Sequence, residues 1–171
     1  SMLSNPQIND AQIAILMMNT PNAANPRDVS IVEQRANQFI AKGILPVLST
    51  VPPRNVPNYD TTYTIPFNQE IKALAQRLNL PVIDYYNEIL LRRPGTSWAN
   101  TLISSDGVHP SGGVNGYSSM SDIYANGGNP ATHTTGDAAV NSGFLLRTWL
   151  TVQKIKEIKI NVVDALPVIS D

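Results

Sequence analysis

The sequence predicts an α/β fold, with a small parallel sheet and helices on both of its faces. Three short apolar segments, residues 12–18, 44–50 and 81–86, are rich in branched side chains and have the length of buried strands. Helical patterns alternate with them, an order that is typical of parallel, right-handed units. Doubly wound domains usually bring about five strands. We therefore expect one α/β domain over residues 1–171 that lacks its N-terminal strands.

The first helix is expected within residues 28–43, after an Asn- and Pro-rich loop. Ser30 and Glu33 have the spacing of a capping box, and Gly43 suits the helix end. One helical face carries the apolar side chains Val29, Val32, Ala36, Phe39 and Ile40. In the strand that follows, Pro46 indicates a bulge or an early strand position.

A second helix is expected over residues 66–79, after a proline-rich loop at 51–64. Its apolar face carries Phe67, Ile71, Leu74, Ala75 and Leu78. A short helix is expected at 87–93, with Arg92 and Arg93 as its solvated end. The last helix is expected over 137–159 with Asp137 as its N-cap, and residues 160–171 then form a tail, a linker or a last strand.

Residues 112–136 are predicted to form a long loop insertion, because they are mostly Gly, Ser, Asn and Thr without a period. Tyr117 and Tyr124 in this loop fit either a lid over a site or a plain surface insertion. Trp98 and Trp149 fit core packing better than the lining of a pocket.

Charge and composition exclude several classes of partner. Twelve basic and thirteen acidic residues give a net charge of −1 without a basic stripe, so we expect no nucleic-acid partner. No apolar run approaches the roughly 18 residues of a membrane span. The chain has no cysteine, which excludes disulfides and thiolate metal sites but leaves the compartment open between secreted, periplasmic and cytoplasmic.

The segment SSDGVHPSGG, residues 104–113, carries the clearest chemical signal. A histidine acts as a general base when an acceptor holds its second ring nitrogen, and Asp106 can reach His109 across a tight turn at Gly107. Two other interpretations stay open. The pair can be an ordinary exposed loop pair, or it can bind a metal, although His133 is the only other histidine and no acidic cluster joins them.

This segment resembles the last sequence block of the GDSL/SGNH hydrolases, a family of esterases, lipases and carbohydrate deacetylases. The resemblance covers roughly residues 12–110 and the helix around 143–159. It implies a flavodoxin-like, three-layer α/β/α fold, with His109 as the general base and Asp106 as the acid that orients it. It also implies no cofactor, and a small-molecule ester or an acetylated carbohydrate as the substrate.

The family's oxyanion donor is an asparagine in a Gly-x-Asn-Asp block after a strand. Here the strand runs into NTPN, and an ungapped alignment puts Asn19 at the Gly place, Pro21 at the donor place and Asn22 at the Asp place. Proline offers no donor, so the candidates are Asn22 with a small shift, or Asn19. Both asparagines also suit an ordinary turn.

The family's nucleophile lies in a G-D-S block, which this sequence does not contain. Ser104, Ser105 and Ser111 flank the pair, but a nucleophile has to reach the base from another segment at about 3 Å. We expect these three serines to stabilise the turn. The nucleophile is then expected outside this chain, on a missing N-terminal segment or on a second chain.

Two hypotheses follow for function. The first is the C-terminal part of an SGNH-type ester hydrolase. The second is a non-catalytic relative that binds a carbohydrate or a protein through the loops at 19–25 and 112–136. A G-D-S block encoded upstream in the gene would favour the first hypothesis.

Overall fold

The computed structural model describes residues 11–17, 28–112 and 138–164 of the chain. It has a mixed α/β fold and divides into two compact units, residues 1–87 and 88–171. Each unit is described by itself. Residues 113–136 of the expected loop at 112–136, the proposed cap Asp137 and the end of the tail at 165–171 lie outside the described residues.

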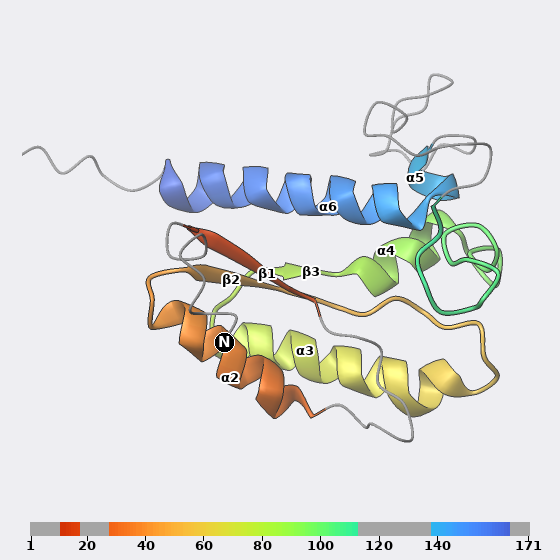
Figure 1. Ribbon diagram of the computed structural model, residues 1–171, viewed down its shortest axis with the longest axis horizontal. Helices are drawn as coiled ribbons and strands as arrows, with labels where there is room; N and C mark the ends of the chain where they lie inside the picture. Colours follow the sequence, from red (N-terminus) through yellow and green to blue (C-terminus); the bar gives the residue numbers. More distant parts are fainter. Residues whose placement is uncertain (1–10, 18–27, 113–137, 165–171) are drawn as a thin grey trace, which may run out of the picture. The chain divides into compact units, whose positions relative to one another are not determined.

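The first unit contains the three parallel strands that the sequence predicts (Figure 1). They are β1 (Ile13–Met17), β2 (Leu45–Ser49) and β3 (Val82–Ile83), in the order β1-β2-β3. Pro46 is the second residue of β2 and stays in regular register with Ala14, so it marks an early strand position without a bulge.

The third strand is shorter than the predicted segment 81–86. It ends at Ile83 because Asp84 turns the chain into a helix, and Asn87 N donates to the Asp84 carboxylate at 3.4 Å. A carboxylate that accepts from the first turn of a helix is a typical cap. Helix α4 (Tyr85–Arg92) therefore starts two residues earlier than the expected helix.

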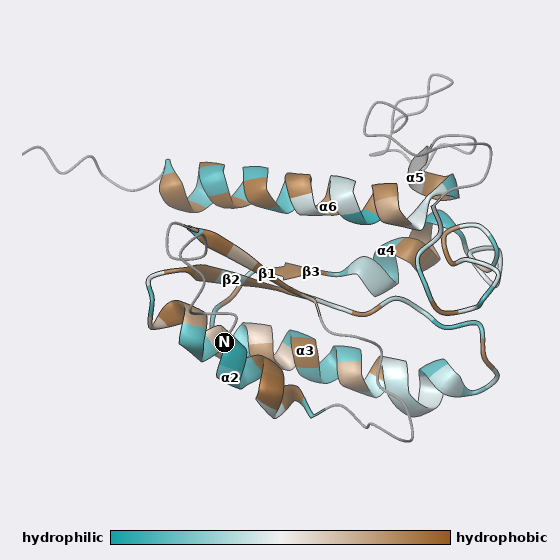
Figure 2. Cartoon of the chain, in the orientation of Figure 1, coloured by the Kyte–Doolittle hydropathy of each residue, from teal (hydrophilic) through white to brown (hydrophobic). Residues whose placement is uncertain are grey.

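Helices α2 (Val29–Ile40) and α3 (Ile65–Arg77) lie on the same side of the strands (Figure 1). The strands are coloured as predominantly apolar in Figure 2. The core between helices and sheet consists of Val29, Val32, Leu48, Val51, Phe67, Ile71, Leu74 and Ala75. These side chains confirm most of both predicted helical faces.

Three details of these helices differ from prediction. Asp28, and not Ser30, caps α2, since its carboxylate accepts from Ser30 N at 2.7 Å. Ile40 is 44% exposed because it lies in the last turn of α2, away from the core. Part of the predicted loop at 51–64 is a π-helix, η2 (Asp60–Thr64), which continues directly into α3.

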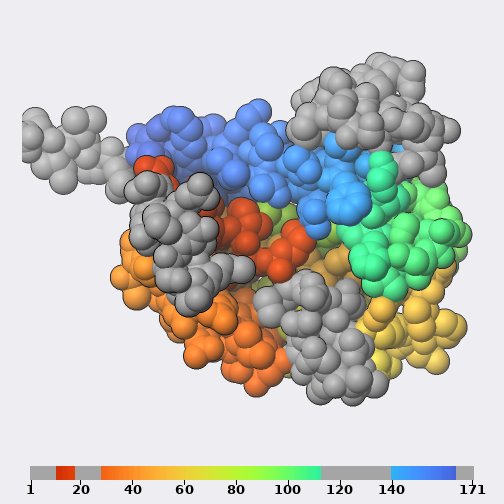
Figure 3. Space-filling view, viewed as in Figure 1, coloured from red at the N-terminus to blue at the C-terminus, as the bar shows by residue number. Residues whose placement is uncertain are grey.

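Strand β1 is partly buried at every position, although its sequence predicts full burial on both faces. Residues of this red segment are visible at the surface in Figure 3. Among the described strands β1 is at the end of the order, whereas β2 has a neighbour on each side and is buried from Pro46 to Ser49. The prediction of burial on both faces is therefore confirmed for most of β2 and wrong for β1.

In the described part of the second unit, the end of α4 is followed by the helical segments α5 (Ala138–Asn141), α6 (Gly143–Ile158) and η4 (Lys159–Val163). The single helix predicted over 137–159 is wrong, because Ser142 is extended and interrupts it. The Ser142 hydroxyl accepts from Leu145 N at 3.3 Å and caps α6. The first residues of the expected tail, 160–163, are helical.

The prediction that Arg92 and Arg93 form a solvated helix end is wrong. Arg92 is only 5% exposed, and its guanidinium binds Glu88 at 2.9 Å and lies over the Trp149 ring, 5.1 Å from its centroid. Arg93 Nε donates to Val140 O at 2.7 Å. Both arginines therefore hold parts of the second unit together.

Candidate active site

The loop at 104–110 is closed by its own main chain. Ser104 N donates to His109 O at 2.8 Å, and Gly107 N donates to Ser104 O at 2.9 Å. Gly107 has a φ of 74°, a left-handed conformation that glycine adopts without strain. The tight turn at this glycine brings the side chains on either side of it together.

Within this loop the expected hydrogen bond between Asp106 and His109 is confirmed. Asp106 Oδ2 lies 2.6 Å from His109 Nδ1. A carboxylate at this position favours the tautomer with the proton on Nδ1 and leaves the lone pair on Nε2. That is the form of histidine that can take a proton from another group.

The other oxygen of Asp106 is held by three donors. Oδ1 accepts from Ser104 Oγ at 2.6 Å, from Val108 N at 2.8 Å and from His109 N at 3.0 Å. These hydrogen bonds, with the one from Ser104 contributing most and that from the His109 ring next, hold the pKa of Asp106 well below its usual range. The carboxylate is therefore ionised at any pH near neutrality.

The His109 ring is open to approach from outside. Its side chain is 74% exposed, compared with 50% for Asp106. Among the residues that the structure describes, none donates to or accepts from Nε2. A hydroxyl from elsewhere therefore has room to reach this nitrogen.

The base of the loop is fixed to the start of α6. The buried Ser111 donates its hydroxyl proton to Thr101 O and accepts from Gly143 N at 3.1 Å, while Ser111 O accepts from Phe144 N at 3.1 Å. A Cβ on Gly143 would overlap the carbonyl oxygen of Leu102. Only glycine allows the helix to approach the loop this closely.

The three serines around the pair can now be compared with their expected role. The Ser104 and Ser111 hydroxyls both hold the turn, as predicted, through Asp106 and Thr101 respectively. Neither hydroxyl bonds to the His109 ring. Ser105 is exposed.

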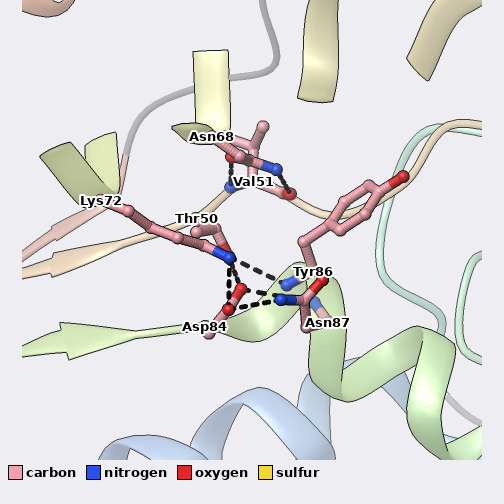
Figure 4. A network of polar contacts seen from close by, with 7 residues as sticks. All are labelled: Thr50, Val51, Asn68, Lys72, Asp84, Tyr86 and Asn87. Carbon is pink, nitrogen blue, oxygen red and sulfur yellow. Dashed lines mark hydrogen bonds and ion pairs between the residues drawn. The ribbon is translucent and has the colours of Figure 1, made fainter. Parts of the chain in front are cut away.

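The first unit carries a second polar cluster, at the carboxyl ends of β2 and β3 (Figure 4). Thr50 Oγ1 accepts from Tyr86 N at 2.9 Å and donates to Asp84 at 3.3 Å. Lys72 Nζ lies 2.6 Å from Asp84 Oδ2, which also accepts from Asn87 Nδ2 at 2.7 Å. These contacts cap α4 and tie it to α3, which is a structural role.

Two further contacts complete this end of the sheet. The Asn68 side-chain amide makes two hydrogen bonds to the main chain of Val51, accepting from its N at 2.8 Å and donating to its O at 2.9 Å (Figure 4). Nearby along the chain, Asp60 accepts from Arg54 N at 2.9 Å and from the Tyr86 hydroxyl at 3.4 Å. Burial raises the pKa of Asp60, and burial together with the Asp60 charge raises the pKa of Tyr86 to about 12.

Asn19, Asn22, Tyr117, Tyr124 and His133 lie outside the described residues. Within the described part of the chain, no three His, Asp or Glu side chains gather as metal ligands would. The helices of that same part include none with the length and apolar character needed to cross a membrane.

Sequence reasoning found the pair and the turn-stabilising role of its serines, but it missed other supports of the loop. It gave no role to Gly143 and did not connect Ser104 to the carboxylate of Asp106. The S-x-D spacing was the available signal, because a serine two residues before an aspartate can donate to it across a turn. A comparison with models of known protein families found no match for the chain, and neither did a comparison with curated protein sequences.

Proposed function

We propose that this chain supplies the acid–base half of a serine ester hydrolase of the SGNH type. The observation that carries the proposal is the 2.6 Å contact between Asp106 Oδ2 and His109 Nδ1, on a ring that is 74% exposed. An ionised acid on one nitrogen and an open second nitrogen are what a general base in acyl transfer requires.

The chemistry would run as follows for a carboxylic ester or an acetylated carbohydrate. A serine from outside residues 1–171 approaches His109 Nε2, which takes its proton as Oγ attacks the ester carbonyl. The protonated ring, stabilised by Asp106, gives this proton to the departing alkoxide. A water molecule then attacks the acyl-serine, with His109 again as base. The carboxylic acid is released, and His109 returns the proton to the serine.

Asn22 or Asn19 would donate to the oxyanion of the tetrahedral intermediate, as the resemblance implies. The three-strand parallel sheet would belong to a flavodoxin-like, three-layer SGNH domain, and the missing strands would bring in the serine. The α/β character and the parallel sheet support this arrangement.

The test measures hydrolysis of p-nitrophenyl acetate by three samples: residues 1–171, the full-length gene product, and that product with His109→Ala. We expect negligible, clear and negligible activity, because loss of the serine or of the histidine alone costs about as much as loss of the whole triad, on the order of a millionfold. A fluorophosphonate probe should label one serine of the active sample, and mass spectrometry should locate it outside residues 1–171.

An inactive, unlabelled full-length product would overturn the proposal. It would favour the alternative, a non-catalytic module that binds a carbohydrate or a protein partner. Labelling of Ser104, Ser105 or Ser111 would instead show that the nucleophile lies within this chain.

A further inference from the structure

The two oxygens of the Asp106 carboxylate have different tasks. Among the residues that the structure describes, Oδ2 contacts the His109 ring alone, at 2.6 Å, whereas Oδ1 accepts the three other hydrogen bonds. Two of those three come from main-chain N–H groups of the loop itself. The third comes from the Ser104 hydroxyl and is the shortest of them, at 2.6 Å.

A short O–H···O⁻ hydrogen bond to a carboxylate is charge-assisted and stronger than a bond between neutral groups. It restrains rotation of the carboxylate, and it stabilises the ionised form. An ionised Asp106 accepts a hydrogen bond from Nδ1–H while the proton stays on the nitrogen. This hydrogen bond sets the tautomer of His109.

On these contacts we propose that Ser104 is a positioning residue, which orients the Asp106 carboxylate and thereby keeps the His109 proton on Nδ1. The proposal deepens the proposed function and rests on it only for its catalytic consequence. The orientation of the pair itself is a property of this chain.

The geometry separates this role from that of a nucleophile. A nucleophilic serine gives its proton to the base, at Nε2. Ser104 gives its proton to Asp106, and its main-chain N donates to His109 O at 2.8 Å. Its hydroxyl is therefore bound to the acid, at the Nδ1 end of the pair.

The experiment uses ¹⁵N-labelled residues 1–171 and four variants: Ser104→Ala, Ser104→Thr, Ser105→Ala and Asp106→Asn. Ring ¹⁵N shifts of His109 give the ratio of the two neutral tautomers. We expect the Nδ1–H form to dominate in the parent chain and the ratio to fall about three- to tenfold in Ser104→Ala, which is the effect of losing one exposed hydrogen bond of ordinary net strength. Ser104→Thr, which keeps the hydroxyl, should restore the ratio.

The controls define the range of the effect. Ser105→Ala removes the hydroxyl of the exposed neighbour and should leave the ratio unchanged. Asp106→Asn presents a donor to Nδ1 and should invert the ratio. A parent-like tautomer ratio in Ser104→Ala would overturn the proposal.

If Ser104→Ala changes the amide spectrum beyond the loop, the tautomer ratio of Ser104→Thr tests the proposal instead. A well-folded Ser104→Thr chain without the Nδ1–H preference would also overturn the proposal. Full-length product carrying Ser104→Ala should lose about tenfold in kcat with little change in KM. If the tautomer ratio changes in Ser104→Ala but the parent full-length product has no esterase activity, the positioning role of Ser104 is supported and the proposed hydrolase function is overturned.

Discussion

Two aspartates of this chain, Asp84 and Asp106, each accept four hydrogen bonds or ion pairs, yet they differ in what those contacts hold. Asp84 Oδ1 accepts from the Thr50 hydroxyl and from Asn87 N. Asp84 Oδ2 accepts from the Asn87 side-chain amide and pairs with Lys72. Both oxygens of Asp84 are thus occupied by groups that hold the sheet, α3 and α4 together.

Asp106 uses one oxygen to accept from the main chain of its loop and from the Ser104 hydroxyl. The other contacts a single titratable ring, and that ring is 74% exposed. The number of contacts does not distinguish a structural carboxylate from a candidate catalytic one. The distinction lies in whether one oxygen is reserved for a group that can exchange protons with something outside the protein.

The largest expected effect is on turnover, when the carboxylate of each aspartate is replaced by the amide of asparagine. Asp106→Asn keeps an acceptor for the loop but places a donor against Nδ1, so the full-length product should lose about 10⁴-fold in kcat. Asp84→Asn should keep its turnover within about threefold. Steady-state kinetics on p-nitrophenyl acetate measures both, and equal losses would erase the comparison.

The next effect concerns the support of the Asp106 loop. Gly143→Ala forces a methyl group into the carbonyl of Leu102, so we expect a loss of about 1–3 kcal/mol in the free energy of unfolding. Gly112→Ala is the control, because nothing lies within 4 Å of its added Cβ. Urea denaturation compares the two, and equal midpoints would show that the close approach is not needed.

A smaller effect is expected from Asp84→Ala, which removes the α4 cap and the partner of Lys72. We expect about 1 kcal/mol of destabilisation. Glu33→Ala breaks an ion pair of the same length, 2.6 Å to Arg77, without removing a cap, and should cost less than about 0.5 kcal/mol. Thermal unfolding of both variants would contradict the structural role of Asp84 if their losses were the same.

The smallest effect concerns pH. Burial raises the folded pKa of Asp60 above its unfolded value, so its contribution to stability is full below the unfolded pKa, about 3.9, and is lost as pH rises through the folded pKa. Asp60→Asn should therefore gain stability relative to the parent chain between pH 4 and neutrality. Denaturant unfolding at several pH values measures the difference in free energy of unfolding between Asp60→Asn and the parent chain. An advantage of Asp60→Asn that decreases as pH rises would contradict a raised pKa of Asp60.

Local patterns predicted most of the first unit and the pair itself. The strands, the buried faces of α2 and α3 and the Asp106–His109 contact all depend on residues a few positions apart. The errors arose where distant residues decide. Arg92 looks like a solvated helix end until Trp149 and the helix that carries it are placed against it, and β1 looks buried until its position in the sheet is known.

The supports of the candidate site were the least predictable part. Nothing near Gly143 in the sequence indicates that its missing side chain makes room for Leu102, which lies on another segment. Likewise Ser142 interrupts a sequence that otherwise suits one continuous helix. Such close approaches depend on tertiary packing, for which periodicity carries no signal.

The Asp106–Gly107 bond has a consequence for the chemical ageing of the protein. An aspartate before glycine is prone to cyclise, because the glycine nitrogen attacks the neutral side-chain acid and expels water to form a succinimide. Hydrolysis then opens this ring and gives mainly isoaspartate. Here hydrogen bonds keep the acid ionised, and the Gly107 N–H is bound to Ser104 O at 2.9 Å. The turn that builds the pair thus also protects it, and isoaspartate should accumulate mainly in chains that have unfolded.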